Sequence, residues 1–233
     1  EIDLISEGYL DWFSENELPY IKSLIEDLKR IDLDNSEISI NLLFEKGEGV
    51  FNRTNDYFEK RIITFSKGLN EEQINQISLH FEELVRKREE ENKKDKRDYK
   101  ERILDNYISG FERIGIDLRD DQIEDIMLQL EQYLEISNEW SDLRQQWTED
   151  FIKLLKNRES YGYESQMKEF FNSLDDLGND EFRLKADVNE KITLEIINFV
   201  FKTADQKQMK SFDRTLDVYL KSINRILSKR QAK

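Results

Sequence analysis

The residues of this chain that could move protons or hold a metal ion are 51 carboxylates and a single histidine. His80 and Glu83 have the His-x-x-Glu spacing of helical metal sites. A di-iron site of that kind needs a Glu-x-x-His pair from each of two helices, and one histidine cannot supply both. The chain has no Cys, which excludes disulfides, zinc–thiolate sites and thiol catalysis. We therefore predict no metal site and no cofactor.

Motifs that carry catalysis are absent from the sequence as well. There is no Gly-rich phosphate loop, no Gly-x-Ser-x-Gly elbow and no Ser–His pairing. General acid–base catalysis needs two carboxylates that converge in a cleft with shifted pKa values, and the sequence does not single out such a pair. We predict no catalytic residues and a protein that is not an enzyme.

Two tryptophans are the residues best placed to line a binding surface. Trp140 and Trp147 are seven residues apart, which places both on one face of a helix. Core packing is the expected role of aromatic side chains at this spacing. A ligand groove is the alternative, and with it comes a second possible class of function, a small-molecule binder or enzyme with a carboxylate-lined or Trp-lined pocket between helices.

A run of charge from Arg86 to Arg102 is the second candidate surface. Only Asn92 and Tyr99 in this run are uncharged, and its basic side chains outnumber its acidic ones. We expect a solvated helix that projects from the core, as is usual for mixed charge of this kind. Contact with an acidic partner or with anionic lipid is the alternative. The residues that would make this contact are Lys93, Lys94, Lys96 and Arg97.

The overall charge narrows the class of partner. The 36 Lys and Arg residues against 51 Asp and Glu residues give a net charge of −15, so the chain repels phosphate backbones and nucleic acid is not expected. No apolar run approaches the roughly 20 residues that a membrane-spanning helix needs. One Pro and eight Gly argue against extensive loops, and no alternating β-branched run indicates strands.

The elements that must position these side chains are helices. Apolar residues recur at steps of three and four along most of the chain. The helices we expect cover residues 4–31 with a break at Pro19, 36–66, 71–111, 120–154, 167–174, 180–201 and 206–227. The prediction is an all-α, irregular bundle of about 6–8 helices, with one long charged helix projecting from the core. We expect residues 1–233 to form a single helical domain, with a division near 110–118 as the alternative.

The same helix-start signal, an acidic first turn that contains a Gln, occurs three times. It begins at Asn70, near Asp120 and near Thr203. The pairs Asn70–Gln73 and Thr203–Gln206 fit a capping box, in which each partner satisfies a backbone N–H that the helix leaves free. The unequal spacing of the three copies favours an irregular bundle over a repeat array.

Four sequence patterns in this order resemble a family of uncharacterised Gram-negative lipoproteins, the domain-of-unknown-function family DUF6279. The first is similar to W-x4-E-L-P-x-Y and the second to G-x-L-[ST]-x-x-Q. The third is W-x3-R-x2-W, and the fourth has the form Q-x-x-x-(apolar)-x-x-x-L-x-x-Y. The matching residues are Trp12, Glu17, Leu18, Pro19 and Tyr20, then Gly115, Leu118 and Gln122, then Trp140, Arg144 and Trp147, then Gln206, Met209, Leu216 and Tyr219. The chain departs from the family at Phe13 and Ser14, where His-Arg is common.

The resemblance implies a helical periplasmic domain that a lipid tethers to a membrane, which we expect to be the outer membrane. A family member carries a signal peptide, a lipidated Cys and a short further segment ahead of Glu1. The family has no known activity. The binding residues that the resemblance suggests are Trp12, Tyr20, Trp140, Arg144 and Trp147.

The expected function is therefore non-catalytic binding of a protein or another envelope component. Its basis is the missing catalytic inventory, the charged surface and the resemblance. Besides the small-molecule binder or enzyme, a cytosolic scaffold that contacts a partner through the charged helix is a further alternative.

Overall fold

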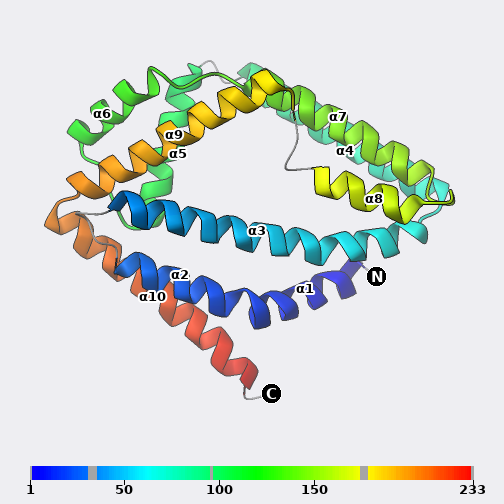
Figure 1. Ribbon diagram of the computed structural model, residues 1–233, viewed down its shortest axis with the longest axis horizontal. Helices are drawn as coiled ribbons and strands as arrows, with labels where there is room; N and C mark the ends of the chain where they lie inside the picture. Colours follow the sequence, from blue (N-terminus) through cyan, green and yellow to red (C-terminus); the bar gives the residue numbers. More distant parts are fainter. Residues whose placement is uncertain (1, 31–35, 95–96, 174–177, 232–233) are drawn as a thin grey trace. The chain divides into compact units, whose positions relative to one another are not determined.

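The computed structural model describes residues 2–30, 36–94, 97–173 and 178–231, and within them it contains ten α-helices and no strand (Figure 1). In chain order they are α1 (Ile2–Asn16), α2 (Leu18–Lys29), α3 (Ser36–Lys67), α4 (Glu71–Lys94), α5 (Tyr99–Arg113), α6 (Asp120–Leu130), α7 (Ser137–Lys156), α8 (Tyr163–Asn172), α9 (Asp180–Thr203) and α10 (Gln206–Gln231). The predicted all-α fold class is confirmed, with slightly more helices than the six to eight expected.

The additional helices come from two stretches that the sequence led us to treat as continuous. The charged run is divided, because α4 ends at Lys94 and α5 begins at Tyr99. Asp98 stands just ahead of α5, where Asp is favoured as an N-cap. The expected helix 120–154 is also divided, into α6 and α7. Glu131 follows the last residue of α6, and its carbonyl oxygen accepts a hydrogen bond from Nζ of Lys100 (3.0 Å).

Contacts between residues divide the chain into two compact units, each assembled from separate stretches of sequence. The first unit takes residues 1–55, 99–133 and 189–233, and the second takes residues 56–98 and 134–188. Helices α3 and α9 therefore contribute to both units. The single domain stays a prediction, and residues 110–118 lie within the first unit.

In the first unit, the N-terminal helix pair packs on the last helix. Helix α2 contacts α10 and α1, and α5 contacts α6. Pro19 lies in the first turn of α2, where its missing N–H costs no hydrogen bond. The side chains of Ile116, Ile126 and Phe212 are fully buried in this unit. No helix in the described ranges is long and apolar enough to cross a membrane.

Two of the helix-start signals can be compared with the capping boxes that the structure contains, one in each unit. Asn70 and Gln73 form the predicted reciprocal capping box, with both bonds at 2.9 Å. The predicted box Thr203–Gln206 is wrong. The box lies two residues further on, between Asp205 and Gln208, because α9 extends through Thr203 and α10 starts only at Gln206.

In the second unit, α7 packs against α4 and α8. Its core consists of Ile63, Leu69, Ile74, Ile152, Leu155, Tyr163 and Met167. The hydroxyl groups of Tyr163 and Ser66 are hydrogen-bonded at 2.6 Å, which joins α8 to the end of α3. Arg158 donates to the carbonyl oxygen of Leu69 (2.6 Å) and so fixes the turn that leads into α4.

Candidate functional site

An open groove lies between helices α4 and α7 of the second unit. They run antiparallel, because Phe81 of α4 meets Phe151 of α7, and Arg88, further along α4, faces Arg144, further back on α7. The groove has a volume of about 340 Å³. It is lined by Phe81, Leu84, Val85 and Arg88 of α4 and by Trp140, Leu143, Arg144, Trp147 and Thr148 of α7. Helices α4 and α7 lie side by side in Figure 1.

Aromatic packing holds the Trp147 ring at the floor of this groove. The ring stacks on Phe151 with a centroid distance of 5.3 Å and an interplanar angle of 13°. It also contacts Phe170 of α8 at 5.1 Å. Aromatic contacts of this kind stabilise a ring beyond its area of burial, so the orientation of Trp147 is fixed before any ligand arrives.

Trp140, the other tryptophan of the groove, packs against helix α9. The ring of Phe182, which is buried, meets Trp140 edge-on at 5.1 Å. One turn away, Lys185 donates to the carboxylate of Glu139 at 2.6 Å. Trp140 nevertheless remains 39% exposed and Leu84 45% exposed. The groove therefore presents a large apolar surface to solvent on a rigid support.

The groove is positively charged. Among the side chains that the structure describes, its lining includes Arg88 and Arg144 and no acidic residue. Neither arginine has an acidic partner among the residues that the structure describes. Partial desolvation and the positive charge of Arg88 lower the pKa of Arg144 below its ordinary value. An anion placed between the two side chains would relieve this repulsion.

Trp147 adds an unused hydrogen-bond donor. Its indole Nε1 is buried and has no partner in the structure. Buried polar groups are usually paired, and one left unpaired costs about 1–3 kcal/mol. The groove thus combines an apolar floor, two cations and a free N–H, which together suit an apolar group that carries an acceptor or a negative charge.

The structure brings together three of the five binding residues that the sequence suggested, namely Trp140, Arg144 and Trp147. Trp12 and Tyr20 belong to the first unit and have structural contacts there. Trp12 stacks on Tyr9 at 6.1 Å, and Tyr20 lies under the guanidinium of Arg53 at 4.7 Å.

The acidic residue of the first sequence pattern is part of this same packing. Glu17 is 1% exposed and accepts two hydrogen bonds from Arg53, each 2.8 Å long. This ion pair, between the buried Glu17 and the exposed Arg53, joins α3 to the α1–α2 corner. The W-x4-E-L-P region therefore has a structural role.

Of the candidate cations in the charged run, Lys94 and Arg97 are exposed. Lys96 and the side chain of Lys93 lie outside the described residues. Lys94 closes α4 and Arg97 precedes α5, so the two are not on one helix face. Their binding role stays a prediction.

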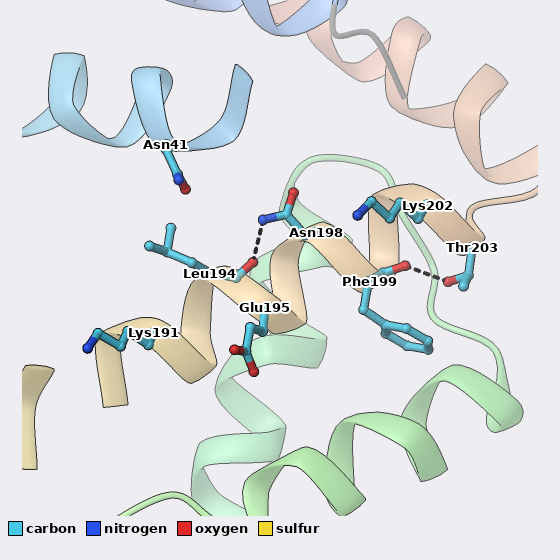
Figure 2. A pocket seen from close by; sticks show the side chains of 8 residues that line it. All are labelled: Asn41, Lys191, Leu194, Glu195, Asn198, Phe199, Lys202 and Thr203. Atoms are coloured by element: carbon cyan, nitrogen blue, oxygen red, sulfur yellow. Dashed lines mark hydrogen bonds between the residues drawn. The ribbon is translucent and has the colours of Figure 1, made fainter. Parts of the chain in front are cut away.

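A second pocket, of about 660 Å³, lies between the first part of α3 and α9 in the first unit (Figure 2). Asn198 donates from Nδ2 to the carbonyl oxygen of Leu194 (2.9 Å), while its buried Oδ1 has no partner. Lys191 and Lys202 also line the pocket, but eleven residues of helix separate their Cα atoms by roughly 16 Å. The two lysines cannot hold one small anion together, which makes this pocket the weaker candidate.

Carboxylates with shifted pKa values lie in ion pairs and helix caps. Lys87, Arg119, Lys185 and Lys67 lower the pKa values of Glu83, Asp121, Glu139 and Glu164, respectively, and the backbone N–H of Gln208 lowers that of Asp205. A general acid needs the opposite shift. Within the described ranges, no three His, Asp or Glu side chains are grouped to hold a metal ion.

Leu84 and Arg88, the two groove residues of α4 on which the proposal depends most, were not singled out from the sequence. Arg88 follows Phe81, Leu84 and Val85 by seven, four and three residues, so it extends the seam by one turn. That spacing is the signal that could have identified it.

A comparison with protein-family models decides the family. The model described as "Family of unknown function (DUF6279)" matches residues 3–183, more than half of the chain. The chain belongs to this family. No curated protein and no solved structure matches it.

The DUF6279 patterns divide into two kinds in the structure. Gly115 and Gln122 of the second pattern are packed against α9 and α10, as Glu17 of the first is packed against α3. In the third pattern, Trp140 and Arg144 are exposed and line the groove with the half-buried Trp147. This pattern is therefore the one whose residues are accessible to a partner. The fourth pattern lies beyond the matched residues.

Proposed function

We propose that this DUF6279 protein is a non-catalytic binding protein of the Gram-negative envelope, and that its partner, a protein or another envelope component, occupies the α4–α7 groove. The observation that carries the proposal is the exposed apolar wall formed by Trp140 and Leu84, beside two cations that have no acidic partner among the described residues. Exposed apolar surface that is held rigid and bordered by charge marks interaction sites.

The envelope location is part of the same proposal. We expect the full-length protein to carry a lipidated Cys ahead of Glu1 and to be held by that lipid at the periplasmic side of a membrane, most simply the outer membrane. Incorporation of labelled palmitate into the full-length protein tests this point, and a protein that takes up no label would remove the periplasmic assignment.

A matched pair of leucines on α4 tests the groove. Leu84 lines it and is 45% exposed, whereas Leu79 is 63% exposed and is not part of its lining. We expect Leu84→Arg to reduce recovery of a partner from solubilised envelopes by about tenfold or more, because a central groove contact is lost and a third positive charge is added. Leu79→Arg should leave recovery unchanged.

The two variants are compared by quantitative pull-down of the full-length lipidated protein, after circular dichroism has shown equal thermal unfolding. If Leu84→Arg recovers the same partners at the same level as the unchanged protein, the groove is not the binding site.

A small molecule is the second candidate for the occupant. The volume of about 340 Å³ falls at the lower end of the range of small-molecule sites, roughly 300–1,000 Å³, and a few polar groups line a mostly apolar surface. Under this alternative, groove variants would abolish binding of a small apolar anion and leave protein recovery unchanged.

A further inference from the structure

We infer that the α4–α7 groove binds an amphipathic helix of a partner protein, with acidic residues of that helix facing Arg88 and Arg144. The inference rests on the proposed function, because it names the occupant of the same groove. Three features of the described residues carry it: the spacing of the lining, its charge, and the free indole N–H.

The spacing of the lining residues fits a helix. On α4 the lining falls at Phe81, Leu84, Val85 and Arg88, and on α7 at Trp140, Leu143, Arg144 and Trp147. Both walls therefore follow the steps of three and four that apolar residues follow on a helix. Two neighbouring helices with an exposed seam of this kind offer the ridges and grooves against which a third helix packs.

The length of the exposed seam sets the size of the occupant. Trp140 and Trp147 are two turns apart, which is about 10 Å along the axis of α7. A partner helix would bury side chains at positions i, i+3 or i+4, and i+7 in this space, as in other helix-in-groove complexes.

The charge of the lining indicates acidic residues on that helix. Arg88 and Arg144 are the only charged residues of the lining within the described part of the chain, and they repel each other. The neighbouring pocket between α4 and α7, which shares Phe81, Val85 and Thr148 with the groove, is different, because Arg86 there forms an ion pair with Glu90 (2.7 Å), and Glu82 and Glu149 are part of its lining. Carboxylates on the partner would complement the groove side specifically.

The indole of Trp147 gives such a carboxylate a further partner. Its buried Nε1 donates to nothing in the free protein. The carboxylate of a Glu side chain can accept from the exposed guanidinium of Arg144, and charge-assisted hydrogen bonds are the stronger kind. It can accept from the Trp147 N–H as well where it displaces the atoms that now cover Nε1.

The test uses two synthetic helices of about 18 residues, long enough to be partly helical in water. Both carry Leu at positions i, i+4, i+7 and i+11, flanked by Glu in one peptide and by Lys in the other. Binding of each fluorescently labelled peptide to the 233-residue chain is followed by anisotropy at low and at physiological salt. We expect the Glu peptide to bind about tenfold more tightly or better at physiological salt, where the long-range repulsion from the net charge of −15 is screened and the close contacts to Arg88 and Arg144 decide the preference.

Variants of the chain locate the charge. Arg88→Gln and Arg144→Gln should each weaken binding of the Glu peptide by about three- to fivefold, the range of a partly exposed ion pair. Arg86→Gln is the matched control, because it removes from the same helix a positive charge that is not part of the groove lining and that already pairs with Glu90, and it should leave the affinity unchanged.

Other outcomes overturn the inference in distinguishable ways. Equal affinity for the two peptides, or no effect of Arg88→Gln and Arg144→Gln, would show that the groove has no preference for acidic helices. The proposal that the groove is the binding site would still hold if Leu84→Arg abolishes binding. Tight binding of laurate without binding of the Glu peptide identifies a small apolar anion. Self-association that Leu84→Arg abolishes identifies a second copy of the chain.

Discussion

Replacing Gly115 with alanine should destabilise the first unit by about 3–5 kcal/mol, which is the largest effect we expect from a single substitution outside the groove. Gly115 has a φ angle of +85°, a conformation that costs a residue with a Cβ atom roughly 1–2 kcal/mol. The added Cβ would also lie 2.8 Å from the carbonyl oxygen of Ser211 and 2.9 Å from Cβ of Thr215, and it would overlap Oγ1 of Thr215.

The reason for the large effect is that α10 cannot move away cheaply. The contact is with its backbone as well as with a side chain, and α10 also packs on α1 and α2. Hydrogen exchange measured by mass spectrometry should show strongly increased exchange in peptides from α5, α6 and α10, and unchanged exchange in peptides from α7 and α8.

Gly162 is the matched control for Gly115. It has nearly the same φ angle, +89°, but an added Cβ would meet nothing within 4 Å. Gly162→Ala should therefore cost only the conformational strain, about 1 kcal/mol. Equal destabilisation by the two substitutions would show that the close approach of α10 to Gly115 has no energetic weight.

Gln122→Ala should destabilise the first unit by about 3 kcal/mol, the second large effect. Gln122 is fully buried at the start of α6. Its Oε1 accepts from the backbone N–H of Arg119 (3.1 Å) and from Nε2 of Gln208 (2.8 Å), and its Nε2 donates to Oγ1 of Thr203 (2.9 Å). The substitution removes all three bonds and leaves the partly buried backbone N–H of Arg119 without this acceptor.

The capping glutamine at the start of α4 provides the comparison with Gln122. Gln73 accepts from the backbone N–H of Asn70 at 2.9 Å, but both residues are exposed and water can replace the bond. Gln73→Ala should cost about 0.5–1 kcal/mol, the usual range for an exposed cap. The two variants are compared by urea unfolding, and a Gln122→Ala protein no less stable than Gln73→Ala would contradict the role of the buried network.

Much of the fold could be predicted from sequence, because helix periodicity and capping are local. The break at Pro19, the start of α3 at Ser36 and the Asn70–Gln73 box all follow from residues within a few positions of each other. The sequence led us to place the last capping box at Thr203 instead of at Asp205–Gln208. Thr203 and Asp205 are both acceptable caps, and the choice between them depends on where α9 ends.

The tertiary role of the three glutamines could not be predicted. Gln122 and Gln208 are buried and hydrogen-bonded to each other, whereas Gln73 is solvated, although all three occupy the same position in their helix starts. The division into two discontinuous units could not be predicted either, because α3 and α9 each continue as one helix from one unit into the other.

Part of the candidate site could be predicted from the sequence. The spacing of Trp140 and Trp147 predicted that they share one helix face, but this spacing is the same whether that face is buried in the core or exposed to solvent. Only the structure shows that this face is incompletely covered and that Arg88 of α4 stands opposite Arg144. Trp12 and Tyr20, suggested by the same resemblance, lie in the other unit.

Photo-cross-linking in intact cells tests the central claim most directly. A benzophenone amino acid is introduced at position 84 or at position 79 of the full-length protein, the two exposed leucines of α4 that differ in whether they line the groove. We predict a discrete cross-linked partner from position 84 that is absent from position 79 and reduced when Arg88 and Arg144 are both replaced by Gln. Equal products from the two positions, or a product from position 79 alone, would contradict the groove as the binding site.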